Sequence, residues 1–149
     1  MAVYTKINKN DISYINKIFN NEKFLSFKGI KQGIENTNYL LKSKNKKFIL
    51  TIFEKRVSDK EIPFFMKLME ILSNSKINCP KPLKNKDGNY LIQLKKKTAC
   101  VVSFLEGKDK NLLNSKNCFE VGRIIALIHN VTKNIKLSRK NSMGIKNLN

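Results

Sequence analysis

Residues Phe27–Arg56, FKGIKQGIENTNYLLKSKNKKFILTIFEKR, decide how this chain folds. Runs rich in β-branched and aromatic residues, separated by turn residues, are typical of neighbouring strands. Such runs predict three strands here, Phe24–Ile30, Thr37–Lys42 and Phe48–Phe53. Gly29 and Gly33 stand in the first connection, where glycine permits positive φ and a close approach of the backbone to another group. The stretch therefore predicts an antiparallel unit with a glycine-bearing turn.

The sequence on either side of this unit predicts helices and two further strands. Asp11 is the expected N-cap of a first helix that runs to Asn21. Ser58 and Glu61 have capping-box spacing and predict a second helix from about Ser58 to Ser75. Later elements are a hairpin at Asp87–Gly88, a strand Thr98–Phe104 and a helix from Ser115 or Asn117 to His129. The order predicts an α+β fold, in which an antiparallel sheet and one long helix are joined to the beginning of a helical part.

Length and composition are those of one ordinary globular domain, with 149 residues and a hydrophobic fraction of 41%. The chain has no stretch of about 18 uncharged apolar residues, which argues against a membrane span. Its first residues lack the apolar block of a signal peptide, so we expect a cytoplasmic protein without membrane partners. Cys79, Cys100 and Cys118 are far apart and show no metal-ligand spacing, which predicts buried, reduced thiols.

The net charge of +19 raises the alternative of a small basic nucleic-acid-binding module. Only Arg56, Arg123 and Arg139 are arginines, however, whereas recognition of phosphates and bases favours Arg wherever bidentate geometry matters. The densest lysine runs, Lys42–Lys47 and Lys95–Lys97, fall where turns are expected. A lysine-decorated surface without a specific nucleic-acid partner is therefore the favoured interpretation.

The glycine spacing alone is weak evidence, because G-x-x-x-G is neither the glycine-rich loop of protein kinases nor a Walker motif. The surrounding strings are more specific, namely SFKGIKQGIENTNYLL, FILTIFEKRV, IPFFMKLMEIL, NCPKPL, DGNYL, VVSFLEG and VGRIIALIH. In this order they resemble the homoserine kinases built on the aminoglycoside-phosphotransferase and choline-kinase fold. The resemblance runs from Met1 to about Gly144.

The resemblance implies ATP-dependent phosphorylation of L-homoserine, with ATP and Mg²⁺ as cofactors and a role in threonine biosynthesis. It implies a nucleotide-binding lobe over residues 1–104 and a hinge with the start of a helical lobe over residues 105–149. In that lobe the Gly29–Gly33 turn covers the phosphates. The other implied nucleotide-binding residues are Glu35, Asn36 and Asn38 beside the turn, Thr51, Lys55 and Arg56 at the strand that usually carries a phosphate-binding lysine, and Val102, Ser103, Phe104 and Leu105 at the hinge. The helix carboxylate that usually pairs with this lysine has two candidates, Glu61 and Glu70.

The catalytic residues of such kinases are absent from the sequence. Phosphoryl transfer in this fold needs a catalytic aspartate and an Asn and Asp that hold Mg²⁺. After Gly107 the chain has one aspartate, Asp109, and it contains no H-x-D or D-F pair. We therefore expect a partial chain, inactive alone and prone to self-association, from a truncated gene, a fragment or a genuine short protein. A kinase for another small alcohol, such as choline or methylthioribose, remains an alternative.

Overall fold

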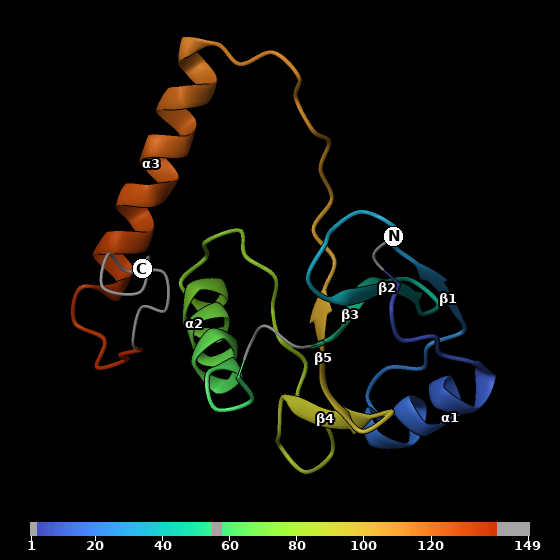
Figure 1. Ribbon diagram of the computed structural model, residues 1–149. Helices are drawn as coiled ribbons and strands as arrows, with labels where there is room; N and C mark the ends of the chain where they lie inside the picture. The colour runs from blue at the N-terminus through green and yellow to red at the C-terminus, as the bar shows by residue number, and fades with distance from the viewer. Residues whose placement is uncertain (1–2, 55–57, 140–149) are drawn as a thin grey trace, which may run out of the picture.

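A five-stranded antiparallel sheet forms the centre of the computed structural model, which describes residues 3–54 and 58–139 (Figure 1). Its strands lie in the order β1-β2-β3-β5-β4. They are β1 (Ser26–Gly29), β2 (Thr37–Lys42), β3 (Lys47–Ile52), β4 (Leu91–Leu94) and β5 (Lys97–Ser103). Apart from Ser26, the first three lie within Phe27–Arg56, and the predicted α+β fold with an antiparallel sheet is confirmed.

Helix α1 (Lys9–Ile18) covers one face of the sheet, which we call the outer face. Ile12 and Ile15 of the helix are buried in one cluster with Leu41, Leu50 and Val101 of the strands. The predicted N-cap was wrong by one turn, because Asn8 caps the helix and Asp11 is the third residue of a capping box. Asp11 fits both positions by residue type, so the sequence alone did not separate them.

Helix α2 (Ile62–Asn74) packs on the opposite face, which we call the cleft face. Ile62 and Met66 are buried against Cys100 and Val102 of β5. The predicted capping box was wrong, because the helix starts at Ile62 and Glu61 makes no side-chain cap. The start of this helix is therefore stabilised by burial of its apolar residues, and not by a side-chain cap.

The hairpin of the last two strands turns at Lys95 and Lys96, within the lysine run where a turn is expected, and a separate turn at Asp87–Gly88 lies between Leu83 and β4. β4 pairs with β5 from Leu94↔Lys97 onward, and both turn lysines have positive φ, 53° and 60°. Gly88 also has positive φ, 80°, but its turn joins β4 to the segment at Pro82, which bridges to Val102 of β5. Asp87–Gly88 therefore links two segments that both pair with β5.

Helix α3 (Ser115–Thr132) stands apart from the sheet at the end of an extended segment (Figure 1). Asn114 caps it, and Asn117 completes the capping box, so the predicted caps Ser115 and Asn117 were both misplaced. No residue of the helix is buried, and its apolar residues Val121 and Ile125 are 60% and 48% exposed. Of the helices that the structure describes, none has the length and apolar character needed to span a membrane.

Candidate functional site

The glycine-bearing turn, residues 30–36, connects β1 to β2 and projects beyond their paired ends. The pairing of β1 with β2 ends at Gly29 and Tyr39, and just beyond it the Ile30 N–H donates to the Asn38 carbonyl oxygen at 2.9 Å. Residues 31–35 are exposed. The turn thus presents backbone to solvent at one end of the sheet, as a phosphate-covering loop requires.

The two glycines of this region serve different purposes. Gly33 has φ of 103°, a conformation that residues with a side chain rarely adopt, and a Cβ built there meets nothing within 4 Å. A Cβ at Gly29 would point to the outer face and approach Val3 Cγ2 to 3.1 Å. Gly33 is therefore required by the backbone of the turn, whereas Gly29 makes room for the N-terminal segment.

Asn38 and Thr51 form a polar pair on the cleft face, at the end of the sheet nearest the turn. They are directly opposed in the β2–β3 register, and the Thr51 hydroxyl donates to Asn38 Oδ1 at 2.8 Å. Thr51 thus stands on the strand, and on the face, expected for a phosphate-binding lysine. Lys55 and Arg56, the other candidates for that role, lie outside the described residues.

The predicted hinge begins at the end of β5. The Ser103 N–H donates to the Lys81 carbonyl oxygen at 2.9 Å, and the Phe104 N–H donates to the Lys47 carbonyl oxygen at 3.1 Å. These two N–H groups are therefore engaged within the fold. Leu105 follows where the chain leaves the sheet and is 37% exposed. Val102 is buried on the cleft face against α2.

A cavity of about 760 Å³ lies between the start of the turn and the hinge. Its lining residues come from three elements that the sequence separates widely: Lys28, Gly29, Ile30, Lys31, Gln32, Leu40 and Phe104. The volume is within the usual range for small-molecule sites. Of the predicted site residues, the cavity brings together Gly29 and Phe104.

Leu40 and Lys28 were not predicted, although the sequence held a signal for Leu40. Alternation along a strand puts Leu40 on the same face as Asn38. The β1–β2 register then pairs Lys28 with Leu40. Glu35, Asn36 and Asn38 do not line this cavity; Asn36 accepts a hydrogen bond from the Glu54 N–H at 3.4 Å, at the base of the turn.

Neither candidate helix carboxylate faces Thr51. Glu70 pairs with Lys67 and Lys84 at 2.8 and 3.1 Å, and the hydrogen bond from Lys67, with the nearby Tyr90 hydroxyl and Lys84 ammonium group, lowers its pKa to about 2. Glu61 instead pairs with Arg139 at 2.9 Å. The usual lysine–carboxylate pair is therefore absent from residues 3–54 and 58–139, and the Asn38–Thr51 hydrogen bond occupies the strand position.

No cluster of three His, Cys, Asp or Glu residues suited to a metal ion occurs in the described part of the chain. Because Mg²⁺ requires oxygen ligands, chiefly carboxylates and phosphates, the described residues do not fit a complete magnesium site. The exposed His129, near the end of α3, is not part of such a cluster.

Comparison with known sequences places this lobe in a family. Residues 26–145 match the phosphotransferase enzyme family, and the chain belongs to that family. Curated proteins named homoserine kinase, from Parvibaculum lavamentivorans and Rhizobium etli, are 37% and 39% identical to it over 145 residues. These alignments cover 97% of this chain and 45% of each relative, so the chain spans about half the length of the curated relatives it matches.

Solved structures support the same fold. A spectinomycin phosphotransferase in complex with ADP and spectinomycin matches with a TM-score of 0.68 and 15% identity, covering 95% of this chain and 44% of that one. An amicoumacin kinase in complex with AMP-PNP and Ca²⁺ matches with a TM-score of 0.64 and 17% identity, covering 90% and 42%. At these identities the likeness establishes the fold.

Proposed function

We propose that this chain is the nucleotide-binding part of a homoserine kinase. The observation that carries the proposal is the cavity between the glycine-bearing turn and the hinge, in a chain 37–39% identical to curated homoserine kinases over 97% of its length. In the complete reaction the homoserine hydroxyl oxygen bonds to the γ-phosphorus of ATP as the bond to the bridging oxygen breaks. The products are O-phospho-L-homoserine and ADP, and a base accepts the hydroxyl proton.

The nucleotide takes its orientation from the chemistry of the two ends of the cavity. Adenine packs on the apolar side chains of Leu40 and Phe104 at the hinge end. Because the N–H groups of Ser103 and Phe104 are engaged within the fold, the adenine edge is bonded by backbone groups of the hinge from Leu105 onward.

The phosphates extend toward the turn at Gly33, close to the Asn38–Thr51 pair, and Glu35 and Asn36 shape that end. Lys28 and Lys31 supply positive charge from the cavity wall. Lys55 and Arg56 follow β3 in the sequence and are further candidates for phosphate contact.

Catalysis requires groups that this chain does not carry. The catalytic aspartate and the Mg²⁺ ligands of this fold are expected in the portion of the relatives beyond the aligned 45%. Residues 1–104 then act as the nucleotide lobe, and residues 105–149 begin the helical lobe. A cytoplasmic location and a role in threonine biosynthesis belong to the same proposal.

Nucleotide binding is the direct test. We expect the chain to bind ADP in isothermal titration calorimetry, Leu40→Gln to weaken that binding, and Leu25→Gln to leave it unchanged. Leu25 is a matched control because it precedes β1, is 63% exposed and does not line the cavity. Absence of ADP binding by the unaltered chain would contradict the proposal.

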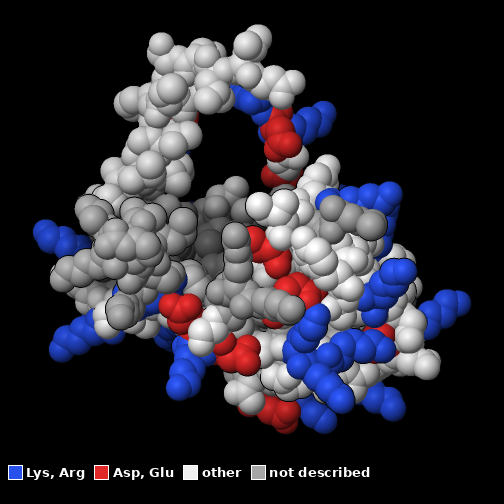
Figure 2. Space-filling model, in the orientation of Figure 1, with Lys and Arg blue, Asp and Glu red and all other residues white. Residues whose placement is uncertain are grey.

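Turnover is a second measurement. With ATP, Mg²⁺ and homoserine, this chain alone should form no phosphohomoserine, and formation at an ordinary kinase rate would show that the absent groups are not needed. The nucleic-acid alternative is not favoured by the face that Figure 2 shows, where acidic side chains lie among the basic ones. It predicts binding to DNA or RNA that weakens steeply with salt, measurable by filter binding.

A further inference from the structure

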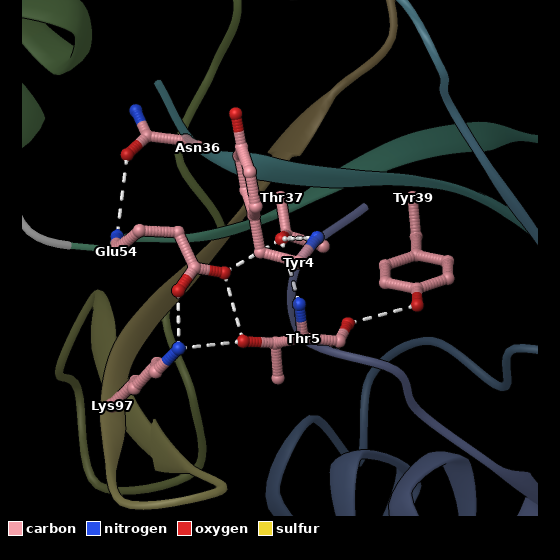
Figure 3. A network of polar contacts seen from close by, with 7 residues as sticks. All are labelled: Tyr4, Thr5, Asn36, Thr37, Tyr39, Glu54 and Lys97. Atoms are coloured by element: carbon pink, nitrogen blue, oxygen red, sulfur yellow. Dashed lines mark hydrogen bonds and ion pairs between the residues drawn. The ribbon is translucent and has the colours of Figure 1, made fainter. Parts of the chain in front are cut away.

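The N-terminal segment Val3–Ile7 crosses the base of the glycine-bearing turn on the outer face, as Figure 3 shows in part. The N–H groups of Tyr4 and Thr5 both donate to Thr37 Oγ1, at 2.9 and 3.1 Å. Tyr39 Oη donates to the Thr5 carbonyl oxygen at 2.9 Å. The segment is therefore bonded to the first and third residues of β2.

The same segment also holds the turn itself. Tyr4 Oη donates to the carbonyl oxygen of Ile34 at 3.0 Å, although the Ile34 side chain is 80% exposed. Val3 packs against Gly29, at the other side of the turn. One short segment thus contacts the chain where it enters the turn, within the turn and where it leaves.

Glu54, which follows β3, joins these contacts to the rest of the sheet (Figure 3). Its Oε1 accepts hydrogen bonds from Thr37 Oγ1 at 2.6 Å and from Thr5 Oγ1 at 2.8 Å. Its other oxygen pairs with the Lys97 ammonium group, which also donates to Thr5 Oγ1 at 2.8 Å. Burial by itself raises the pKa of Glu54, but hydrogen bonds from Lys97, Thr37 and Thr5 outweigh it and lower the pKa.

The burial of these groups makes their geometry stringent. Thr37 is fully buried, Thr5 is 8% exposed and the Glu54 side chain is 10% exposed. The Thr37 hydroxyl donates its one proton and accepts two, so a residue without that hydroxyl leaves the N–H groups of Tyr4 and Thr5 without an acceptor. Buried donors left unpaired are costly, so these groups hold one arrangement.

We infer that Val3–Ile7, Thr37, Glu54 and Lys97 form a brace that positions the glycine-bearing turn for nucleotide. The inference rests on the proposed function, because the turn is the part of the chain assigned to the phosphates. The exposed residues 31–35 give the turn no apolar core of its own, so the contacts at its base and at Ile34 help to set its conformation. The brace residues touch no nucleotide and act through the turn.

Hydrogen exchange of the turn amides tests the brace without any ligand. Thr37→Val removes the central hydroxyl at nearly constant volume, and we expect exchange over residues 30–36 to rise about tenfold relative to the β4–β5 hairpin. Thr37→Ser keeps the hydroxyl and should restore slow exchange. Tyr4→Phe removes only the bond to Ile34 and leaves the buried groups in place, so it remains informative if Thr37→Val fails to fold.

The control is Ile12→Val, which destabilises the outer-face core without touching the brace. An equal rise in exchange across the whole chain, or none in the turn for both Thr37→Val and Tyr4→Phe, would overturn the inference. ADP titration is the second arm, where we expect Thr37→Val to weaken binding several-fold and Thr37→Ser to match the unaltered chain. If the unaltered chain binds no ADP, the proposed function fails, and the exchange data still decide whether the brace exists.

Discussion

Replacing Gly33 by alanine tests whether the turn must hold its strained backbone to bind nucleotide. Gly33 has φ of 103°, and a Cβ added there meets nothing within 4 Å. Steric contact therefore contributes nothing, and the cost is backbone strain alone, about 1–2 kcal/mol for a residue with a side chain. A penalty of that size reduces the ratio of the native turn to its alternative conformations about 5- to 30-fold.

Gly88 provides a matched control within the same chain. It also has positive φ, 80°, and open space around the added Cβ, but it lies in the turn before β4 and does not line the cavity at the hinge. Gly88→Ala and Gly33→Ala should therefore carry a similar strain. Only Gly33→Ala should weaken ADP binding in calorimetry, by about tenfold.

Two results would refute this reasoning. Unchanged ADP affinity in Gly33→Ala would mean that the turn conformation does not matter to the ligand. Equal losses of affinity in Gly33→Ala and Gly88→Ala would mean that strain anywhere in the lobe is felt at the site, so that the turn has no special part. Urea unfolding of both variants checks that each remains folded during the titration.

Three further predictions concern acid stability, thiol reactivity and association. Because the pKa of Glu70 is lowered from 4.5 to about 2, its ion pairs stabilise the fold above pH 4.5 and this contribution is lost as the pH falls toward about 2. The full shift corresponds to about 3 kcal/mol, which solvent screening of the exposed lysine partners reduces to about 1 kcal/mol. The urea midpoint should therefore fall less steeply with decreasing pH in Glu70→Gln than in the unaltered chain. Identical pH dependence of the two midpoints would disprove the role of Glu70. Burial raises the pKa of Cys100 to about 12, so a thiol reagent at neutral pH should modify the exposed Cys118 first and reach Cys100 only in denaturant, whereas three equally fast thiols would contradict the structure. The exposed apolar residues of α3 should cause self-association that increases with protein concentration. The double variant Val121→Asn/Ile125→Asn should associate less. Analytical ultracentrifugation that shows a monomer of the unaltered chain at every concentration would exclude this association.

The sheet was predictable from the sequence because its signals are strong and local. The run Phe48–Phe53 is apolar except for Thr51, and β3 at Lys47–Ile52 agrees with it within one residue. Burial on both faces, under α1 and α2, explains why this run does not alternate with polar residues. The turn at Gly33 followed from the same reasoning, because glycine is the residue that a φ of 103° favours.

Helix caps and strand pairings for which the sequence offers two similar candidates were not predictable. Asn8 and Asp11 are both good helix caps, and only the folded chain selects between them. Asp87–Gly88 carries a hairpin signal, yet the segments on its two sides, at Pro82 and in β4, both pair with β5. Here tertiary pairing overrides local preference.

The brace was missed for a related reason. Thr5, Thr37, Glu54 and Lys97 are far apart in the sequence, and each alone reads as an ordinary surface residue. Glu54 pairs with Lys97 across 43 positions of the chain, so no local pattern reveals the contact. The signal that was available is alternation in β2, which turns Thr37 away from the cleft face that Asn38 lines.

Alternation in β2 also explains how the two faces of the sheet affect one another. Thr37 and Tyr39 point to the outer face and bond the N-terminal segment, while Asn38 and Leu40 point to the cleft face, where Asn38 bonds Thr51 and Leu40 lines the cavity. A strand cannot shift on one face alone, because a change in register moves every side chain along it. Any movement of the N-terminal segment at Thr37 is therefore transmitted through one peptide unit to Asn38. The candidate site on the cleft face consequently depends on residues of the outer face that do not line its cavity.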